Sequence, residues 1–560
     1  MSLDDIKQQL ESESLAEEVT TPAAETADTA QDPFSSFVEV NRVAEKKEKK
    51  TRFSKQTRTI IFTSAGAILL AVVLLLVTLL PSSDVVGSSG SAGDAVVDNS
   101  IVLVDKTVKD TVTVKQVDVR NESGEYTIFY NETEKIFQLK GYEDILLSKS
   151  MTDTLTAYTT VVSAADKVNN VDKLSTFGLD KPVATATITY KDGSTCTVSV
   201  GDMIPSEDGY YAQVSGDENV YMFTSDTAAI FQMMSVAFAD TTLISTPSVK
   251  SDDKNGSAVL KEITYTGKNY PQPLHIRRSY HTDMTELTYY SYIISDPYLR
   301  GTNDATSGIL TNFKSLSAVQ ALVLHPTEEQ KKRVGFDNPL SVMNITMAVE
   351  TPAESDTSET DDAEINTYYN STTTKVTVGS QDEDGNYIVM VDGINAIFLV
   401  DKAVFSSVAD RNYANSVNTL LFAKNIVKVS RIAIKTAEND CNFTLTHFPE
   451  AEESDDEMKV TQGDTTYSTQ EFRELYTLMM SIMRYDTWEE APSGESALTI
   501  HLYNLDGSLF LGADFYSISG SRFLVRTTKG EQFTTRSAEV NHFIKQVANY
   551  VNGEDVLTLT

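Results

Sequence analysis

The chain has 560 residues, a formal net charge of −34 and only two cysteines. A surface this acidic repels nucleic acid, and the sequence has no basic patch with interleaved aromatic residues that would bind it. Two cysteines are too few for a disulfide-stapled scaffold. Cys196 and Cys441 each alternate with apolar neighbours, which indicates two small buried side chains, and a disulfide between them is the open alternative.

The first 58 residues are predicted to be a largely disordered cytoplasmic tail. Residues 1–41 are polar, acidic and rich in Ser, Thr and Ala, a composition that cannot bury a core. Leu3, Ile6 and Leu10 could line a short helix that docks on a cytosolic partner. We favour a solvated tail, because short isolated helices are unstable in water.

An uncharged apolar run from Ile60 to Leu80 predicts one transmembrane helix over residues 59–81. At about 1.5 Å per residue the run would span roughly 31 Å, close to the thickness of a bilayer's hydrocarbon core. Lys and Arg are frequent before this run and none follows it until Lys106, so the positive-inside rule puts the N-terminus in the cytoplasm. A cleaved signal peptide is disfavoured by the long preceding tail. We therefore expect a single-pass protein of the cell membrane, with residues 82–100 as a flexible linker and the remaining mass extracytoplasmic.

Beyond this linker the sequence alternates between polar and apolar residues, as half-buried strands do. Clear examples are TVTVKQVDV (111–119) and TCTVSV (195–200). One helix is predicted near Ser150, and another begins at Ser468, where Glu471 completes a capping box. The first carries four apolar side chains on one face: Met151, Leu155, Tyr158 and Val162. The expected fold class is α+β, with tandem β-rich repeats and short helices in an extracytoplasmic region, preceded by one transmembrane helix.

An element of the type Gly-x-Asp-x-Pro occurs twice, as GLDKP at residues 178–182 and as GFDNP at residues 335–339. Each copy is followed by an Ile-Thr pair, then by VSVGD (198–202) or VTVGS (376–380), and then by a DGYY or DGNY hairpin. The element is predicted to be architectural: Gly for backbone freedom, Asp for a side-chain-to-backbone turn bond, and Pro for launching the next strand. Its residues are Gly178, Asp180, Pro182, Gly335, Asp337 and Pro339.

A third, degraded copy is predicted at the C-terminus, where TIHLYNLDGS (499–508) resembles TITYKDGS (187–194). The Gly-x-Asp-x-Pro element is absent from this copy. The working division is therefore three tandem α+β repeats. They cover residues 101–245, 246–424 and 425–560.

The GLDKP element, the strand after it, VSVGD and the tyrosine-bearing hairpin DGYYAQV (208–214) resemble the bacterial family called domain of unknown function 4340. The resemblance is good over residues 140–225 and partial over residues 315–410. It implies a membrane-anchored extracytoplasmic protein, often associated with ABC-type export systems of the kind linked to gliding motility. It implies no site residues, because the family has no established catalytic ones.

Candidate chemistry is sparse in the sequence. His275 and His281 flank two arginines and are interpreted as part of a polar strand rather than a metal site. The segment Asp382–Gly385 could suggest calcium, but a hairpin turn is favoured because the distal ligands are missing. Five tyrosines could form a glycan or peptide platform, with a half-buried strand pair as the favoured alternative. They are Tyr280, Tyr289, Tyr290, Tyr292 and Tyr298.

These observations favour a protein that is not an enzyme and that uses no cofactor or metal. The leading hypothesis is an extracytoplasmic interaction or scaffold protein, an accessory component of an ABC-type envelope transport system with protein partners in the cell envelope. A cell-surface glycan- or peptide-binding module is the alternative, and a hydrolase with an unrecognised carboxylate site is the third. No nucleic-acid partner is expected, and the sequence identifies no small-molecule ligand.

Overall fold

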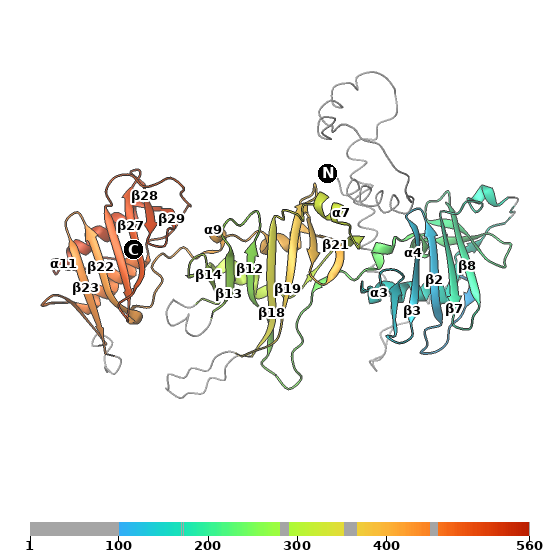
Figure 1. Cartoon of the computed structure of the whole chain (residues 1–560), viewed down its shortest axis with the longest axis horizontal. Coiled ribbons are helices and arrows are strands. Elements are labelled where there is room, and N and C mark those ends of the chain that lie inside the picture. Colours follow the sequence, from blue (N-terminus) through green and yellow to red (C-terminus); the bar gives the residue numbers. More distant parts are fainter. Residues whose placement is uncertain are drawn as a thin grey trace, which may run out of the picture. The chain divides into compact units, whose positions relative to one another are not determined.

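The computed structural model describes residues 100–169, 171, 173–279, 290–351, 367–448 and 457–558. The chain divides into two compact units, and the boundary between them lies after Phe238. Each unit is built on antiparallel sheets, one large sheet in the first unit and two in the second (Figure 1).

The first unit contains an eight-stranded sheet with the strand order β4-β3-β2-β7-β8-β9-β10-β6, while β1 and β5 pair with each other. The strands are β1 (Ile101–Asp105), β2 (Val114–Asn121), β3 (Gly124–Asn131), β4 (Ile136–Leu139), β5 (Val161–Ala164), β6 (Asp166–Lys167), β7 (Ala184–Tyr190), β8 (Thr195–Met203), β9 (Gly209–Val214) and β10 (Tyr221–Thr224). The helical segments are α3 (Lys149–Thr160), η2 (Leu174–Phe177), α4 (Ser225–Gln232) and η3 (Ser235–Phe238).

Alternation along the strands gives this sheet one buried face and one open face. In β7, Ile188 and Tyr190 are buried, whereas Thr187 on the opposite face stays partly accessible. Helices α3 and α4 pack on the buried face. There the Tyr190 hydroxyl donates to the Thr159 carbonyl oxygen, 2.8 Å away, at the end of α3. The buried polar tip is thereby satisfied, which a core tyrosine requires.

The second sheet has nine strands in the order β15-β14-β13-β12-β18-β19-β20-β21-β17, and β11 pairs separately with β16. The strands are β11 (Thr242–Ile244), β12 (Ser257–Thr266), β13 (Leu274–Arg278), β14 (Tyr292–Asp296), β15 (Arg300–Gly301), β16 (Leu316–Ser317), β17 (Gln320–Leu324), β18 (Ser341–Thr351), β19 (Thr367–Gln381), β20 (Tyr387–Val391) and β21 (Ile394–Val400). The helices are α6 (Asp304–Asn312), α7 (Glu328–Arg333), α8 (Lys402–Ala409) and α9 (Tyr413–Ser416).

The third sheet has eight strands in the order β25-β24-β23-β22-β26-β27-β28-β29. The strands are β22 (Val429–Thr436), β23 (Asp440–His447), β24 (Met458–Gln462), β25 (Thr465–Tyr467), β26 (Leu498–Asn504), β27 (Leu509–Ser517), β28 (Arg522–Thr527) and β29 (Gln532–Arg536). The helical segments are η4 (Ile426–Lys428), α10 (Thr469–Met480) and α11 (Ser537–Val551). The core of this sheet centres on Phe443, whose ring lies edge-on to Tyr467, Phe472 and Tyr550.

All three sheets follow the same path. A first meander is followed by a helix and then by a four-stranded meander, and the first strands of the two meanders pair in the middle of the sheet. These central pairs are β2–β7, β12–β18 and β22–β26. The predicted common strand order of the two Gly-x-Asp-x-Pro copies is confirmed by β7-β8-β9-β10 and β18-β19-β20-β21, and β26-β27-β28-β29 repeats it.

The chain also enters each sheet in the same way. β1 pairs with β5, β11 pairs with β16, and Leu420 forms a bridge to Met483. In each sheet the later partner of the pair comes shortly after an α-helix: β5 after α3, β16 after α6, and Met483 after α10. β11 therefore goes with the second sheet, although it precedes residue 246, where the second repeat was predicted to begin.

The expected fold class needs correction. The described residues form a β-rich series of antiparallel sheets, and none of their helices is long and apolar enough to cross a membrane. The longest of them, α11, has 15 residues. It would reach only about 22 Å, short of the hydrocarbon core of about 30 Å. The predicted transmembrane helix is thus unsupported; its segment, Ile60–Leu80, lies outside the described residues, as do the predicted tail and nearly all of the predicted linker.

Both cysteines are free and buried, Cys196 in β8 and Cys441 in β23. Burial raises the pKa of the Cys196 thiol and raises that of Cys441 to about 11. Because the thiolate is the reactive form, both groups are poor nucleophiles near neutral pH. They pack as small core side chains, and the disulfide considered as an alternative is not formed.

Candidate functional site

Both Gly-x-Asp-x-Pro elements begin where a short helix ends. Gly178 follows η2 and Gly335 closely follows α7, and both glycines have a positive φ, 70° and 88°. The next residue in each copy, Leu179 or Phe336, donates its N–H to the carbonyl oxygen five residues back, at 3.1 and 3.0 Å. This is a helix end of the Schellman type, which glycine favours because it has no Cβ to strain the left-handed conformation.

Each of these glycines also lies against the hairpin that follows in the sequence. A Cβ added to Gly178 would lie 2.7 Å from the backbone nitrogen of Asp202, at the end of VSVGD. A Cβ added to Gly335 would lie 2.8 Å from the carbonyl oxygen of Gly379, in VTVGS. The two copies therefore share the same close backbone approach, which only glycine permits.

The glycine on the other side of this approach is equally constrained. A Cβ on Gly201 would overlap the carbonyl oxygen of Phe177, and a Cβ on Gly379 would overlap that of Val334. The recurrence of VSVGD and VTVGS has a steric cause, because a strand glycine must face the helix end in both copies.

The aspartates of the element are placed differently from what the sequence predicted. Asp180 and Asp337 are exposed, and neither side chain has a hydrogen-bond partner among the residues that the structure describes. The turn bond expected of Asp180 is therefore not seen. Pro182 and Pro339 each stand two residues before a strand, β7 or β18, where a missing N–H removes no ladder bond.

Asp180→Ala is expected to change the free energy of unfolding by no more than about 0.5 kcal/mol, because an exposed side chain without a partner contributes little. Urea denaturation followed by circular dichroism measures the change. A loss above about 1 kcal/mol would show that Asp180 makes a stabilising hydrogen bond. Loss of a binding activity at an unchanged melting temperature would instead make the element a functional site.

The open face of the first sheet carries short polar side chains in rows that cross the strands. One row comprises Arg120, Thr185, Ser199 and Gln213. The next row comprises Asp118, Thr187, Thr197 and Ser215. Within it the Thr187 and Thr197 hydroxyl oxygens are 3.2 Å apart, and Asp118 accepts from the Thr127 hydroxyl at 2.7 Å. Donors and acceptors thus repeat at the strand spacing of about 4.8 Å.

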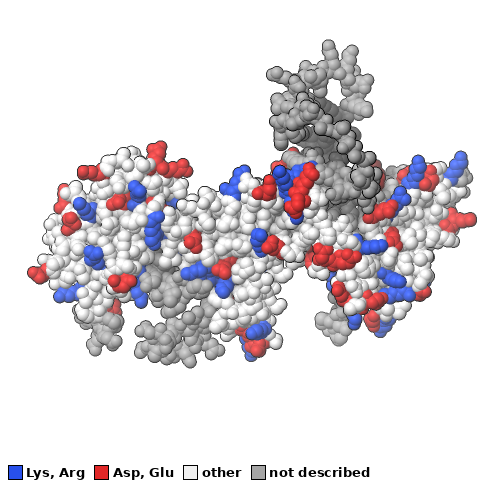
Figure 2. Space-filling view, in the orientation of Figure 1, with Lys and Arg blue, Asp and Glu red and all other residues white. Residues whose placement is uncertain are grey.

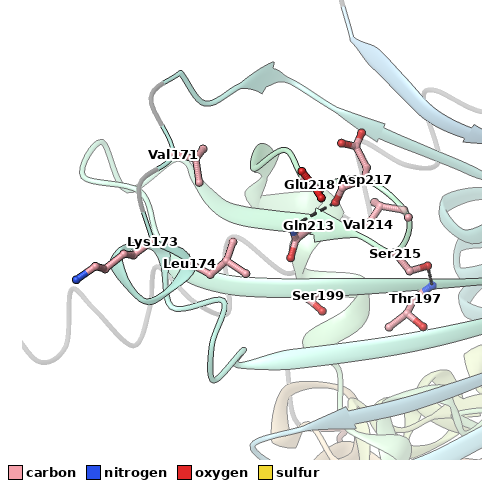
Figure 3. Close-up of a pocket in the computed structure, with 11 residues that line it drawn as sticks. Val171, Lys173, Leu174, Thr197, Ser199, Gln213, Val214, Ser215, Asp217 and Glu218 are labelled. Atoms are coloured by element: carbon pink, nitrogen blue, oxygen red, sulfur yellow. Dashed lines mark hydrogen bonds between the residues drawn. The ribbon is translucent and has the colours of Figure 1, made fainter.

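Two open hollows lie on this face. One, of about 520 Å³, extends from Leu174 across β8 and β9 (Figure 3), and another, of about 580 Å³, lies over β2, β3 and β7. The first hollow is lined mainly by hydroxyl, amide and charged side chains. These are Lys173, Thr197, Ser199, Gln213, Ser215, Asp217 and Glu218. Such groups can exchange hydrogen bonds with an extended polar ligand.

Asp217, at the first hollow, is held in place by its neighbours. Its carboxylate accepts from the Tyr221 hydroxyl at 2.6 Å and from the Asn219 N–H at 2.9 Å. The hydrogen bond from Tyr221 is the largest cause that lowers the pKa of the Asp217 carboxyl below its usual value. The hollow therefore has a fixed negative charge beside its hydroxyl groups.

Charges of both signs are interspersed over the described parts of the face that Figure 2 shows. Neither Lys and Arg nor Asp and Glu form a continuous patch on that face. This distribution does not favour a strongly charged ligand there.

The histidine pair considered as a metal site is not assembled as one in the described residues. His275 lies 3.1 Å from a carboxylate oxygen of Glu262 and 3.7 Å from one of Asp296, while His281 lies outside the described residues. Across the part of the chain that the structure describes, no group of three or more His, Cys, Asp or Glu residues is placed to hold a metal ion. His275 is thus a hydrogen-bond partner of Glu262 within its sheet.

The acidic segment around Asp382 forms a tight turn between β19 and β20. The Asp382 carboxylate accepts the N–H groups of Asp384 and Asn386 at 3.0 and 2.8 Å, and Gly385 has a φ of 85°. The interpretation as a hairpin turn is confirmed, since the carboxylate is used to close the turn.

The tyrosine cluster does not form a platform among its described members. Tyr292 is buried, and its hydroxyl donates to the carbonyl oxygen of Leu260 at 2.7 Å. Tyr298 lies edge-on to Tyr413. Tyr280 and Tyr289 lie outside the described residues.

The sequence did not single out the polar rows of the open face, although a signal for them was present. Thr185, Thr187 and Thr189 share one parity in β7, opposite to the buried side chains. The position of Thr185 in one row with Ser199 and Gln213, and of Thr187 in one row with Thr197, depends on strand pairing, which the sequence of one strand does not reveal.

These features define a class of protein: a tandem β-rich protein of helix-covered antiparallel sheets with open polar faces. Residues 138–339 match the model of the family described as Domain of unknown function (DUF4340), which confirms the family resemblance, and this part of the chain is a DUF4340 domain. The match runs from β4 to the end of the second Gly-x-Asp-x-Pro element, so it contains both copies of that element. No curated protein matches the chain.

Proposed function

We propose that this chain is a non-catalytic interaction protein of the cell envelope and that its open sheet faces bind partner proteins. The observation that carries the proposal is the open face of the first sheet, with its rows of polar side chains and its open hollows. Small-molecule sites usually enclose most of their ligand, whereas protein contacts use broad, shallow surfaces. The open face of the first sheet is broad and shallow, as protein-contact surfaces are.

Polar faces of the same kind recur in the second unit. On the second sheet, the partly accessible Asn344 donates its side-chain amide to the Thr264 hydroxyl oxygen, 3.1 Å away. On the third sheet, the Arg431 guanidinium lies 3.6 Å from the centre of the Tyr503 ring. Several interaction faces on one chain support a scaffold role, because joined sites bind a partner assembly more tightly than single ones.

As the specific role, we propose an accessory component of an ABC-type envelope transport system. The DUF4340 domain over residues 138–339 supports this role through the association that the family resemblance implies. Under this proposal the described residues lie outside the cytoplasm, and the partners are subunits of the transporter or envelope proteins next to it.

A glycan-binding module is a second candidate, and the hollow over β8 and β9 favours it. Ser199, Gln213 and Asp217 line that hollow and can exchange hydrogen bonds with sugar hydroxyl groups.

The proposal is tested by site-specific photo-cross-linking in intact cells of the source organism. A photoactivatable residue at Thr187 or Ser199 is expected to capture a subunit of an ABC transporter, identified by mass spectrometry. The matched control is Asp153, which is exposed on α3 in the same unit, on the helix-covered side of the sheet. Equal capture from Asp153, or capture of no transporter subunit from the open face, contradicts the proposal.

Thr187→Arg gives the same test a quantitative form. A bulky charge at the centre of the face should weaken partner binding at least about tenfold at an unchanged melting temperature, because central interface positions dominate affinity. If the variant keeps transporter binding but loses binding to purified envelope polysaccharide, the glycan-binding candidate replaces the first.

A further inference from the structure

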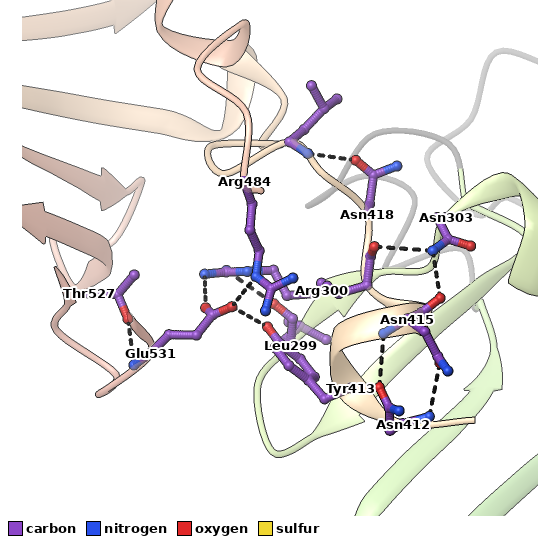
Figure 4. Close-up of polar contacts among 12 residues, drawn as sticks. Leu299, Arg300, Asn303, Asn412, Tyr413, Asn415, Asn418, Arg484, Thr527 and Glu531 are labelled. Carbon is purple, nitrogen blue, oxygen red and sulfur yellow. Dashed lines mark hydrogen bonds and ion pairs between the residues drawn. The ribbon is translucent and has the colours of Figure 1, made fainter. Parts of the chain in front are cut away.

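The joint between the second and third sheets contains a buried cluster of charges (Figure 4). Glu531, just before β29, accepts from Arg300 of β15 at 3.0 Å and from the Tyr413 hydroxyl of α9 at 2.6 Å. Arg484 approaches the same carboxylate at 3.5 Å. The side chains of Arg300, Arg484 and Glu531 are 6%, 7% and 5% exposed.

The side chains of this buried cluster come from two different sheets. Glu531 and Arg484 lie in the third-sheet part of the chain, whereas Arg300 and Tyr413 lie in the second-sheet part. One carboxylate oxygen faces Arg300, and the other faces Tyr413 and Arg484. Buried charges tolerate few arrangements, because each must keep its partner in place of water. The cluster is therefore satisfied only while the two sheets hold one relative position.

The chain that joins the two sheets is hydrogen-bonded on both sides. Toward the second sheet, the Asn303 N–H donates to the Ser416 carbonyl oxygen and the Asn418 N–H donates to that of Gly301, both at 2.8 Å. Toward the third sheet, the Arg484 N–H donates to the carbonyl oxygen of Thr419 at 2.7 Å. These bonds oppose hinge motion in this stretch.

Apolar packing continues across the joint as well. Ile293 of β14 is fully buried and belongs to the same core cluster as Val429 and Phe533 of the third sheet. Tyr290 and Leu299 are partly buried against that cluster. The two sheets thus share apolar core contacts as well as polar ones. Domains that move relative to each other usually meet at a more polar interface, so a shared apolar core opposes such motion.

We infer that the second and third sheets form one rigid body and that Glu531 is the clamp that fixes their relative orientation. The open faces of the two sheets are then held at a constant distance and angle. Such a fixed pair of faces binds two sites of a partner only if the spacing matches, which turns the joint into a determinant of partner geometry.

The test is the distance distribution between two nitroxide labels on the whole chain, measured by pulsed electron paramagnetic resonance. Labels at Thr311→Cys in α6 and Lys545→Cys in α11 occupy exposed positions on the helices of the two sheets, whereas the native cysteines are buried. One narrow distance is expected with Glu531 present. Glu531→Gln should widen the distribution at least about twofold, because it leaves two buried guanidinium groups without a counter-charge.

Two further variants keep the test decisive. Asp486→Asn removes the exposed ion-pair partner of Arg522 two residues after Arg484, but it changes no group that contacts Glu531, so it should leave the distribution narrow. Tyr413→Phe removes one hydrogen bond to Glu531 and leaves both ion-pair partners in place, so it should widen the distribution to a smaller extent while the third sheet stays folded. The inference is overturned by a broad distribution with Glu531 present, by a narrow one in Glu531→Gln, or by equal widening in Asp486→Asn. If Glu531→Gln unfolds the third sheet, an unchanged distribution in Tyr413→Phe overturns it.

Discussion

Replacing Gly201 by alanine is expected to lower the free energy of unfolding of the first sheet by about 3 kcal/mol, and Gly379→Ala that of the second sheet by a similar amount. The new methyl group would overlap the carbonyl oxygen of Phe177 in one case and that of Val334 in the other. Backbone at a helix end cannot yield as a flexible side chain does, so the cost should lie at the upper end for overpacking.

Differential scanning calorimetry of the whole chain measures this loss. At about 2–4 °C per kcal/mol, the transition of the affected sheet should fall by roughly 6–12 °C. The control is Gly308→Ala in α6, where a Cβ meets nothing within 4 Å. It should stabilise the protein by up to about 1 kcal/mol, since alanine favours helix interiors. If Gly379→Ala proved as harmless as Gly308→Ala, the close glycine contact would not exist in solution.

Phe443→Ala is expected to lower the stability of the third sheet by about 3–5 kcal/mol. The Phe443 ring is fully buried, and its edge-on contacts with three aromatic rings of β25, α10 and α11 lie 5.4 to 5.5 Å from centre to centre. Removing it leaves a cavity at the point where these elements meet, and the rigid rings around it cannot collapse fully into the space.

Phe448→Ala is the matched control for this change. Phe448 is 45% exposed, so its removal should cost less than about 1 kcal/mol. Thermal unfolding followed by near-ultraviolet circular dichroism reports on the aromatic cluster directly. If Phe443→Ala left every transition of the chain unchanged, the C-terminal residues would not depend on the core that the structure assigns to them.

The match between the first and third copies was predictable because turn chemistry is local. In Asp192–Ser194 and in Asp506–Ser508, the serine N–H donates to the aspartate carboxylate, at 2.8 and 2.9 Å. In both turns the side-chain hydrogen bond from the serine is the largest cause that lowers the pKa of the aspartate carboxyl. A DGS tripeptide makes these bonds within itself, so the sequence alone identifies the hairpin.

Helix faces were less predictable. The helix expected near Ser150 exists as α3, but its buried side chains are Thr152, Leu155 and Thr159, and the chain from Val161 already forms β5. Of the predicted face, Leu155 and Val162 are buried and Met151 and Tyr158 are partly buried, so apolar spacing located the face but missed the two threonines on it. The buried threonines satisfy their hydroxyl groups on carbonyl oxygens of the preceding turn, which makes them acceptable in the core.

The N-terminal cap of α10 was also predicted only in part from the sequence. Ser468 caps α10 as expected, accepting the Glu471 N–H at 3.2 Å. The capping box is not completed, because the Glu471 carboxylate accepts the N–H of Val556 at 2.6 Å. A partner 85 residues away therefore replaces the local one.

The sequence by itself determined the strand periods, the hairpin turns and the recurrence of the Gly-x-Asp-x-Pro element, because these depend on residues a few positions apart. Only the tertiary structure decided which glycine lies against which carbonyl, which threonines share a row, and where buried charge is neutralised. Arg300 and Glu531 are 231 residues apart, and the sequence around each of them gives no indication that its side chain is buried. Their burial follows from the way two sheets pack, since the desolvation of a charge depends on everything around it rather than on its neighbours in sequence.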